Sequence, residues 1–222
     1  MNDRIGAGSA RAAGKEPTTR EALLEAGREL FAAAGYHATS IRSITGSAGA
    51  NLGAVTYHFG SKEGLYHAVL ENALAPFRRV VRVAAESRTA PLEGIKAFLR
   101  ASFQHLLDHP ELRALMLEQL ASEGPLPEPV KRTFRSNFGL LRKLIEAGQE
   151  EGTICGGDPR LLAVAVAAQP AVLNLLRPVL EQAGGISTAS REDREVIIEN
   201  AIRFVRAGLG APGPSSDRAA VR

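Results

Sequence analysis

Residues 40–59 constrain the fold more than any other stretch, because two short apolar helical patterns meet there at a single glycine. Ile44 and Ala48 share one helical face before Gly49, and Val55 continues the apolar pattern after it. A glycine at such a corner enters a sharp turn that most other residues adopt only with strain. Two helices joined by a short turn containing glycine form a helix-turn-helix, so the stretch predicts this motif.

Helical spacing of apolar residues continues through almost the whole chain, without a run of alternating strand residues and without an internal repeat. The first helix begins at a capping box formed by Thr18 and Glu21, and Gly35 is placed to end it as a left-handed cap. The fold class is therefore all-α, with three short N-terminal helices that contain the helix-turn-helix. We expect these to form a DNA-binding domain, since the motif is typical of one, followed by a larger helical ligand-binding and dimerisation domain, because a bundle of long helices commonly encloses a cavity or builds a dimer face. Further helices are expected at about residues 40–48, 52–59, 62–85, 92–108, 111–122, 127–151, 159–182 and 191–207.

This pattern divides the chain into four parts. The arm and the start of the first helix carry four basic residues, which either follow the DNA minor groove or are simply solvated. They are Arg4, Arg11, Lys15 and Arg20. We expect a flexible N-terminal arm at 1–17, the helix-turn-helix domain at 18–62, the ligand-binding and dimerisation domain at 63–210 and a disordered tail at 211–222.

Composition excludes some classes of protein and leaves others open. The single cysteine, Cys155, excludes an internal disulfide and a cysteine-rich zinc module. The net charge of +3 is weak evidence for a polyanionic partner. Residues 161–180 are apolar and long enough to span a bilayer, but they include Gln169, Asn174 and Arg177, which are costly in lipid. With no secretory signal visible, we expect a cytoplasmic protein with no membrane partner, in which this segment is a buried helix.

The second helix of a helix-turn-helix lies in the DNA major groove, and here it has the sequence NLGAVTYHF. Tyr57 and His58 lie at its end, and Lys62 begins the next helix, so a hydroxyl, an imidazole and an ammonium can each bond a phosphate oxygen. Thr39 and Ser40 offer hydroxyls and backbone amides to another phosphate. Double-stranded DNA is therefore the expected partner.

Base reading is expected from the outward side of the same helix. Asn51 and Thr56 have side chains that form hydrogen bonds, Leu52 and Ala54 can touch thymine methyl groups, and Arg42 of the preceding helix can reach a guanine. The outward candidates are Asn51, Leu52, Gly53, Ala54 and Thr56.

The stretch LFAAAGYHATSIRSITGSAGANLGAVTYHFGSKEGLY resembles the DNA-binding pattern of the TetR family of bacterial transcription regulators, from its LF-x-x-x-G-aromatic run to its Y-x-F and S-K-E-x-L elements. The resemblance covers residues 18–70, and NLGAVTYHFGSKEGLY further looks like the CerR/CecR-type branch. It implies an all-helical homodimer, a palindromic operator and repression relieved by a small molecule. Family members often have lysine at the position of Leu52 and an aromatic residue at that of Thr56, and Gly46 weakens its helix by several tenths of a kcal/mol up to about 1.

The larger domain offers candidates for an effector site and for a dimer interface. An apolar cavity with a few polar groups is expected, so the unknown effector is itself largely apolar, although plain core packing explains most of these residues individually. The cavity candidates are Phe103, Leu107, Met116, Gln119, Phe134, Asn137, Phe138, Leu141 and Gln169. The last two helices are expected to form the dimer interface, unless residues 161–180 are a core helix within one subunit. The interface candidates are Leu161, Ala165, Ala168, Val172, Leu175, Leu176, Val179, Ile198, Ile202 and Val205.

Other functions are weaker hypotheses. His105 and His109 have the spacing of a zinc-binding pair, but Pro110 follows and no third ligand is evident, so no metal or other cofactor is expected. The sequence has no nucleophile elbow, phosphate-binding glycine loop or metalloprotease motif, so no enzyme activity is expected. The leading hypothesis is a ligand-responsive repressor; the alternatives are an activator or ligand-independent regulator of the same fold, and an interaction protein whose helix-turn-helix is only structural.

Overall fold

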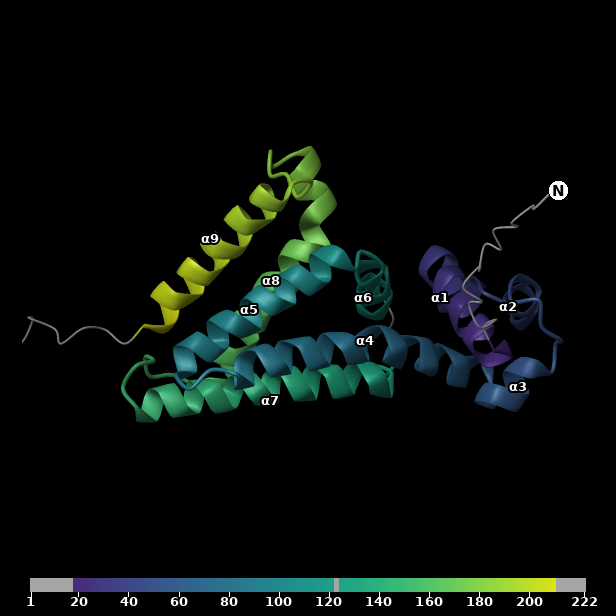
Figure 1. Ribbon diagram of the computed structural model, residues 1–222, viewed down its shortest axis with the longest axis horizontal. Helices are drawn as coiled ribbons and strands as arrows, with labels where there is room; N and C mark the ends of the chain where they lie inside the picture. Colours follow the sequence, from purple (N-terminus) through teal and green to yellow (C-terminus); the bar gives the residue numbers. More distant parts are fainter. Residues whose placement is uncertain (1–17, 122–123, 211–222) are drawn as a thin grey trace, which may run out of the picture.

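The structure is a computed structural model that describes residues 18–121 and 124–210, and these residues form helices joined by turns and short loops. A small head contains α1 to α3 and a large body contains α4 to α9 (Figure 1). The expected all-α fold class is confirmed. The helices are α1 (Thr19–Ala38), α2 (Ile41–Ser47), α3 (Ala54–Phe59), α4 (Lys62–Glu86), α5 (Pro91–Asp108), α6 (Glu111–Ala121), α7 (Glu128–Glu150), α8 (Pro159–Gln182) and α9 (Arg191–Leu209).

Helix ends follow the expected local signals with two differences. The capping box of Thr18 and Glu21 is present at the start of α1. Gly35 has a positive φ of 78°, as expected, but its ψ of 168° is not that of a left-handed helical cap, and another helical turn follows it. The helix expected at 52–59 begins only at Ala54, because the turn after Gly49 uses the intervening residues.

One buried cluster joins the head to the body. Leu23, Phe31, Ile44 and Val55 come from the head, and Leu65 comes from the first turn of α4. The same cluster receives apolar side chains from α5, α6 and α7, so the head is packed against the body rather than attached by a free linker. The side chains contributed by these three helices are Leu106, Leu112, Leu115 and Val130.

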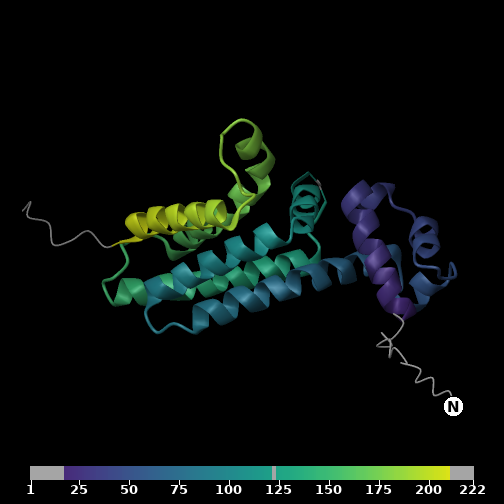
Figure 2. The same ribbon diagram turned by 45° about the horizontal axis from the view of Figure 1, so that its top comes forward.

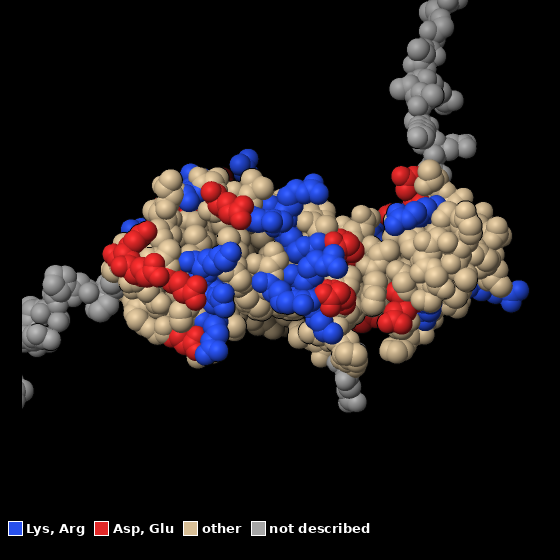
Figure 3. Space-filling model, turned by 90° about the horizontal axis from the view of Figure 1, so that it is seen from below, with Lys and Arg blue, Asp and Glu red and all other residues tan. Residues whose placement is uncertain are grey.

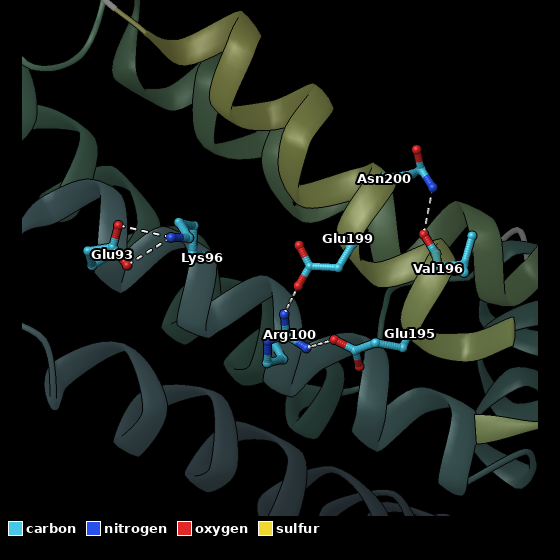
Figure 4. Close-up of polar contacts among 7 residues, drawn as sticks. All are labelled: Glu93, Lys96, Arg100, Glu195, Val196, Glu199 and Asn200. Carbon is cyan, nitrogen blue, oxygen red and sulfur yellow. Dashed lines mark hydrogen bonds and ion pairs between the residues drawn. The ribbon is translucent and has the colours of Figure 1, made fainter. Parts of the chain in front are cut away.

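The body is built around a second cluster, in which α4, α5, α7, α8 and α9 meet. Helices α4 and α7 lie side by side along the length of the body, and α9 packs against α5 and α8 (Figure 2). Arg100 of α5 forms ion pairs with both Glu195 and Glu199 of α9, which fixes the last helix to the body (Figure 4).

Helix α8 is the one helix among the described residues whose length and composition would allow it to cross a membrane. Its inner side packs into the body through Ala163, Val166, Pro170 and Asn174. Leu162, Ala167 and Leu173 also pack against the core, whereas its exposed large apolar side chains are Leu161, Val164, Val172, Leu176 and Val179. Only one side of α8 is therefore buried, whereas the sequence predicted a helix that is buried as a whole. The expected arm and tail, with Arg4, Arg11 and Lys15, lie outside the described residues.

Candidate nucleic-acid interface

Helix α3 has one face buried in the head and the other face open to solvent. Ala54 and Val55 pack into the cluster that joins head and body. Thr56 and Tyr57 point away from it, and Tyr57 is 85% exposed. A large aromatic side chain this exposed gains little from the hydrophobic effect, so its place is better explained by a partner than by packing.

The turn between α2 and α3 depends on Gly49, which has a φ of 62°. An L-residue with a side chain rarely adopts this conformation, although a Cβ built there would contact nothing within 4 Å. Ala50 donates a backbone hydrogen bond to Thr45 at 2.9 Å, which closes the turn. The structure therefore has the helix-turn-helix geometry that the sequence predicts.

The three expected phosphate contacts lie on consecutive elements. The His58 ring lies edge-on to the Tyr57 ring, with 4.9 Å between their centroids. Lys62 is the first residue of α4, directly after Ser61, whose hydroxyl accepts a 3.0 Å hydrogen bond from the Gly64 amide. The helix N-terminus adds positive potential beside the Lys62 ammonium, which suits an anion such as phosphate.

The structure buries two of the side chains that were expected to contact DNA. Thr39 is only 4% exposed, and its hydroxyl donates to the backbone carbonyls of Gly35 at 2.8 Å and Leu30 at 3.2 Å. Its hydroxyl therefore closes the end of α1 and is not free for phosphate. Ala54 is 6% exposed because α3 begins later than expected and turns this residue inward. The other expected contacts at the start of α2, in the turn before α3 and on α3 are exposed, namely Ser40, Arg42, Asn51, Leu52, Gly53 and Thr56.

Charge does not distinguish this surface from the rest of the molecule. On the face drawn in Figure 3, Lys and Arg gather mainly over the body, interleaved with Asp and Glu, while the head is mostly uncharged. Several of the body's basic residues are paired, as Arg135 is with Glu128 and Arg142 with Glu146. The interface is therefore recognised by its helix-turn-helix geometry.

The expected effector-site residues do not form one group. Phe103, Leu107, Asn137 and Leu141 are buried, whereas Met116, Phe138 and Gln169 are half-buried. Phe134 is exposed and stacks on Phe138 with 5.4 Å between ring centroids, so it lies at the surface of the body, and its place in a cavity lining stays a prediction. Gln119 is bound to the Tyr66 hydroxyl near the head.

Buried polar atoms in the body form a clearer signal. The Ser102 hydroxyl, the Asn137 amide oxygen and both amide atoms of Asn174 have no hydrogen-bond partner among the described residues. Pro178 cannot donate the backbone hydrogen bond that the Asn174 carbonyl would receive in a regular helix. The sequence analysis did not single out Ser102 or Asn174 as candidate effector-site residues; a polar asparagine within the apolar run of residues 161–180 was the available signal.

The expected dimer residues divide between the two helices. On α8, Leu161, Val172, Leu176 and Val179 are exposed large apolar side chains. Ala165 is also exposed, and Ala168 and Leu175 are half-buried along the same helix.

On α9, the assignment of Ile198, Ile202 and Val205 to the interface is wrong, because these side chains are buried in the body's own core. The face of α9 that carries them packs inward beside Arg100, whose ion pairs fix the orientation of the helix. The exposed apolar residues of α9 are instead Val196 and Phe204, and Phe204 is 69% exposed.

The histidine pair is close, with 4.2 Å between the ring centroids of His105 and His109. His109 Nδ1 lies 3.1 Å from a Glu111 carboxylate oxygen. Burial, and then the neighbouring His109, lower the pKa of His105. Within the described ranges, no group of three histidine, cysteine or acidic residues could hold a metal ion.

The helix-turn-helix of the head and the larger helical body define the class of this protein: a helix-turn-helix DNA-binding protein. Residues 23–69 match the sequence model of the family described as bacterial regulatory proteins, tetR family. This match and the relatives below support a TetR-family transcriptional regulator, and those relatives are named as regulators or repressors. It is 26% identical over 191 residues to the transcriptional regulator RutR of Escherichia coli, a match that covers 86% of this chain and 90% of RutR. It is also 26% identical to the transcriptional repressor NicS of Pseudomonas putida, covering 60% of this chain and 65% of NicS.

Solved structures share the fold. A bacterial regulatory protein of the tetR family from Rhodococcus RHA1 has a TM-score of 0.71 at 21% identity, and the match covers 89% of this chain and all of that one. AibR, solved in complex with isovaleryl coenzyme A and operator DNA, has a TM-score of 0.67 at 17% identity, covering 84% of this chain and 97% of that one. Likeness at these identities supports the arrangement of helices and nothing finer.

Proposed function

We propose that this chain is a ligand-responsive repressor that binds a palindromic operator as a homodimer and releases it when a small molecule binds the body. The observation that carries the DNA-binding part is Tyr57, 85% exposed on a short helix whose opposite face is buried. In a helix-turn-helix this exposed face enters the major groove. Asn51, Thr56 and Arg42 then read base edges, while Tyr57, His58, Lys62 and Ser40 contact phosphates.

The outer faces of α8 and α9 support a homodimer. Leu176 and Val179 of α8, with Phe204 of α9, expose apolar side chains along both helices. Two copies of this helix pair facing each other would bury these side chains in a four-helix interface with two-fold symmetry. A palindromic operator needs such a symmetry, because each reading head then meets an equivalent half-site about 34–36 Å from the other.

The buried polar atoms of Ser102, Asn137 and Asn174 favour an uncharged effector. They lie on α5, α7 and α8, which pack on one another in the body. The polar residues of the described body that are buried as whole residues are uncharged, namely these three with Thr133 and Thr188. One buried carboxylate oxygen, that of Glu71 on α4, lies 3.7 Å from the Arg132 guanidinium. Since a buried charge needs a charged or strongly polar partner, a largely apolar molecule with hydrogen-bonding carbonyl, hydroxyl or amide groups suits this interior best.

The mechanism is conformational linkage through α4, which is one continuous helix from the head into the body. A ligand that binds one arrangement of α5, α7 and α8 better than another would shift α4 and with it the separation of the two heads. The alternatives are activation instead of repression and regulation without a ligand. Membership of the CerR/CecR-type branch and a cytoplasmic location remain predictions.

A fluorescence-anisotropy titration with a labelled duplex from the DNA upstream of the chain's own gene tests the DNA-binding proposal. We expect binding that resists mixed-sequence competitor DNA, with two subunits or a multiple of two per site, and that weakens as salt rises. Lys62→Ala should weaken it, whereas Lys143→Ala, which removes an exposed lysine from α7 of the body, should not. Equal affinity of both variants and the wild type would refute the assignment of Lys62 to phosphate binding.

A further inference from the structure

One carboxylate of the body holds together three helices around the reading head. Glu118 of α6 accepts hydrogen bonds from the backbone amide of Tyr36, at the end of α1, and from the Tyr66 hydroxyl of α4, the second at 2.8 Å. The Gln119 side-chain amide donates to the same Tyr66 hydroxyl at 2.7 Å. A side chain of the body therefore contacts the head directly, next to the helix-turn-helix.

Gly35 allows this close approach. A Cβ atom at this position would lie 3.3 Å from Glu118 Oε1, closer than an ordinary van der Waals contact. Its φ of 78° is also a conformation that favours glycine. The chain therefore has, directly before Tyr36, a residue that permits both the backbone turn and the nearby carboxylate.

The Tyr66 hydroxyl is a fixed donor to this carboxylate. Tyr66 is buried, and burial raises its pKa well above the ordinary value, with a further contribution from the hydrogen bond to Glu118. The hydroxyl therefore stays protonated. The rings of Tyr66 and Tyr36 lie 4.8 Å apart, and Phe31 packs edge-on against Tyr66 at 4.9 Å. The Tyr36 ring is thus held by its neighbours as well as by its backbone.

The Tyr36 ring in turn contacts the side chain of Lys62. The Lys62 ammonium nitrogen lies 4.4 Å from the centroid of this ring, within the range of a cation–π contact. A lysine side chain has four rotatable bonds and loses much conformational entropy when it contacts a phosphate. A ring that already restricts the ammonium lowers this entropic cost.

We propose that Glu118 is a positioning residue for DNA binding: it fixes Tyr36, and the Tyr36 ring holds the Lys62 ammonium ready for a phosphate. This inference rests on the proposed DNA-binding function, in which Lys62 contacts the backbone. Because Glu118 belongs to α6 of the body, any shift of α6 away from α1 would also release Lys62. The body would then control a DNA-contacting side chain as well as the spacing of the heads.

A double-mutant cycle tests this role. Glu118→Ala and Lys62→Ala are compared singly and together, by anisotropy with the duplex from upstream of the chain's own gene. Glu150→Ala is the charge-matched control, since Glu150 is an exposed carboxylate of α7 in the body. We expect Glu118→Ala to weaken DNA binding about two- to five-fold per head, which corresponds to the free energy of one exposed cation–π contact. The double variant should bind no more weakly than Lys62→Ala alone.

A conservative pair separates positioning from general stability. Tyr36→Phe keeps the ring and the backbone amide, and its affinity should equal that of the wild type. Tyr36→Leu removes the ring, and its loss should match that of Glu118→Ala. The proposal would be overturned if the losses of DNA affinity in Glu118→Ala and Lys62→Ala added up in the double variant. It would also be overturned if Tyr36→Leu bound DNA with the affinity of the wild type. If Glu118→Ala fails to fold, Glu118→Gln keeps the shape and removes the charge, and the same cycle is measured with it.

A measurement without DNA separates this inference from the proposed function. Amide hydrogen exchange of Tyr36 should be faster in Glu118→Ala than in the wild type and unchanged in Glu150→Ala. Equal exchange rates of the Tyr36 amide in all three proteins would show that Glu118 does not fix Tyr36, whatever the result with DNA. A wild type that binds no DNA, with Tyr36 exchange still dependent on Glu118, would overturn the proposed function and the role in DNA binding together, and leave only a structural contact.

Discussion

Replacing Asn174 by leucine is expected to stabilise the protein and at the same time to abolish its response to an effector. Asn174 is 3% exposed, and neither atom of its side-chain amide has a hydrogen-bond partner among the described residues. A buried polar group without a partner costs about 1–3 kcal/mol, and leucine is branched at Cγ like asparagine and carries no such cost, although it is the larger side chain. Asn174→Leu should therefore raise the free energy of unfolding by about 1–3 kcal/mol, or the Tm by about 2–12 °C for a chain of this size.

Equilibrium urea unfolding at a fixed protein concentration measures this change, since dimerisation makes apparent stability depend on concentration. Asn200→Leu is the matched control, because Asn200 is an exposed asparagine of α9 whose side chain bonds the Val196 carbonyl (Figure 4). Its free energy of unfolding should change by no more than about 0.5 kcal/mol. An Asn174→Leu variant less stable than the wild type would refute the reasoning, because the relief of an unpaired amide would then be outweighed by a satisfied amide or by overpacking of the larger leucine.

Four further changes test other parts of the structure. Tyr57→Phe should weaken operator binding in anisotropy titrations while analytical ultracentrifugation still finds a dimer; unchanged affinity would remove the phosphate contact of its hydroxyl. Leu176→Glu with Phe204→Glu should convert the dimer to monomers in the same centrifugation assay, and an intact dimer would exclude these faces. Gly49→Ala should lower the free energy of unfolding by about 1–2 kcal/mol, because φ there is 62°; unchanged urea unfolding would contradict this. The lowered pKa of His105 means that the folded state disfavours its protonation, so stability should fall as pH drops below about 6.5, and less so in His105→Phe; equal slopes in both proteins would exclude His105.

The helix-turn-helix was predictable because its signals are local. The positive φ of Gly49 and the capping box at Thr18 depend on residues within a few positions of each other. Ala54 and Thr39 were misplaced for a different reason. Whether a residue near a helix start points inward depends on where the helix begins, and local signals fix that point only to within a few residues.

The orientation of α9 was not predictable, because both of its faces carry apolar residues. Ile198 and Ile202 face the core while Phe204 faces outward. The choice between these faces depends on Arg100, far away in the sequence, which pairs with Glu195 and Glu199 of the helix. A pattern of apolar residues identifies a helix with two apolar faces, but it does not decide which face packs in the core and which meets another subunit.

The shared core explains why a ligand in the body would affect the head at all. Leu106, Leu115 and Val130 belong to α5, α6 and α7, yet they pack in the same cluster as Ile44 and Val55 of the helix-turn-helix. Close-packed side chains resist continuous deformation, so a shift of these helices moves the head with them or breaks the packing. If a ligand separates α5 from α7, it therefore acts on the head through the continuous helix α4 and through this cluster, in addition to the contact of Glu118 with Tyr36. A variant that stiffens α4 alone would leave the connection through the cluster intact, and effector release of DNA should persist in it.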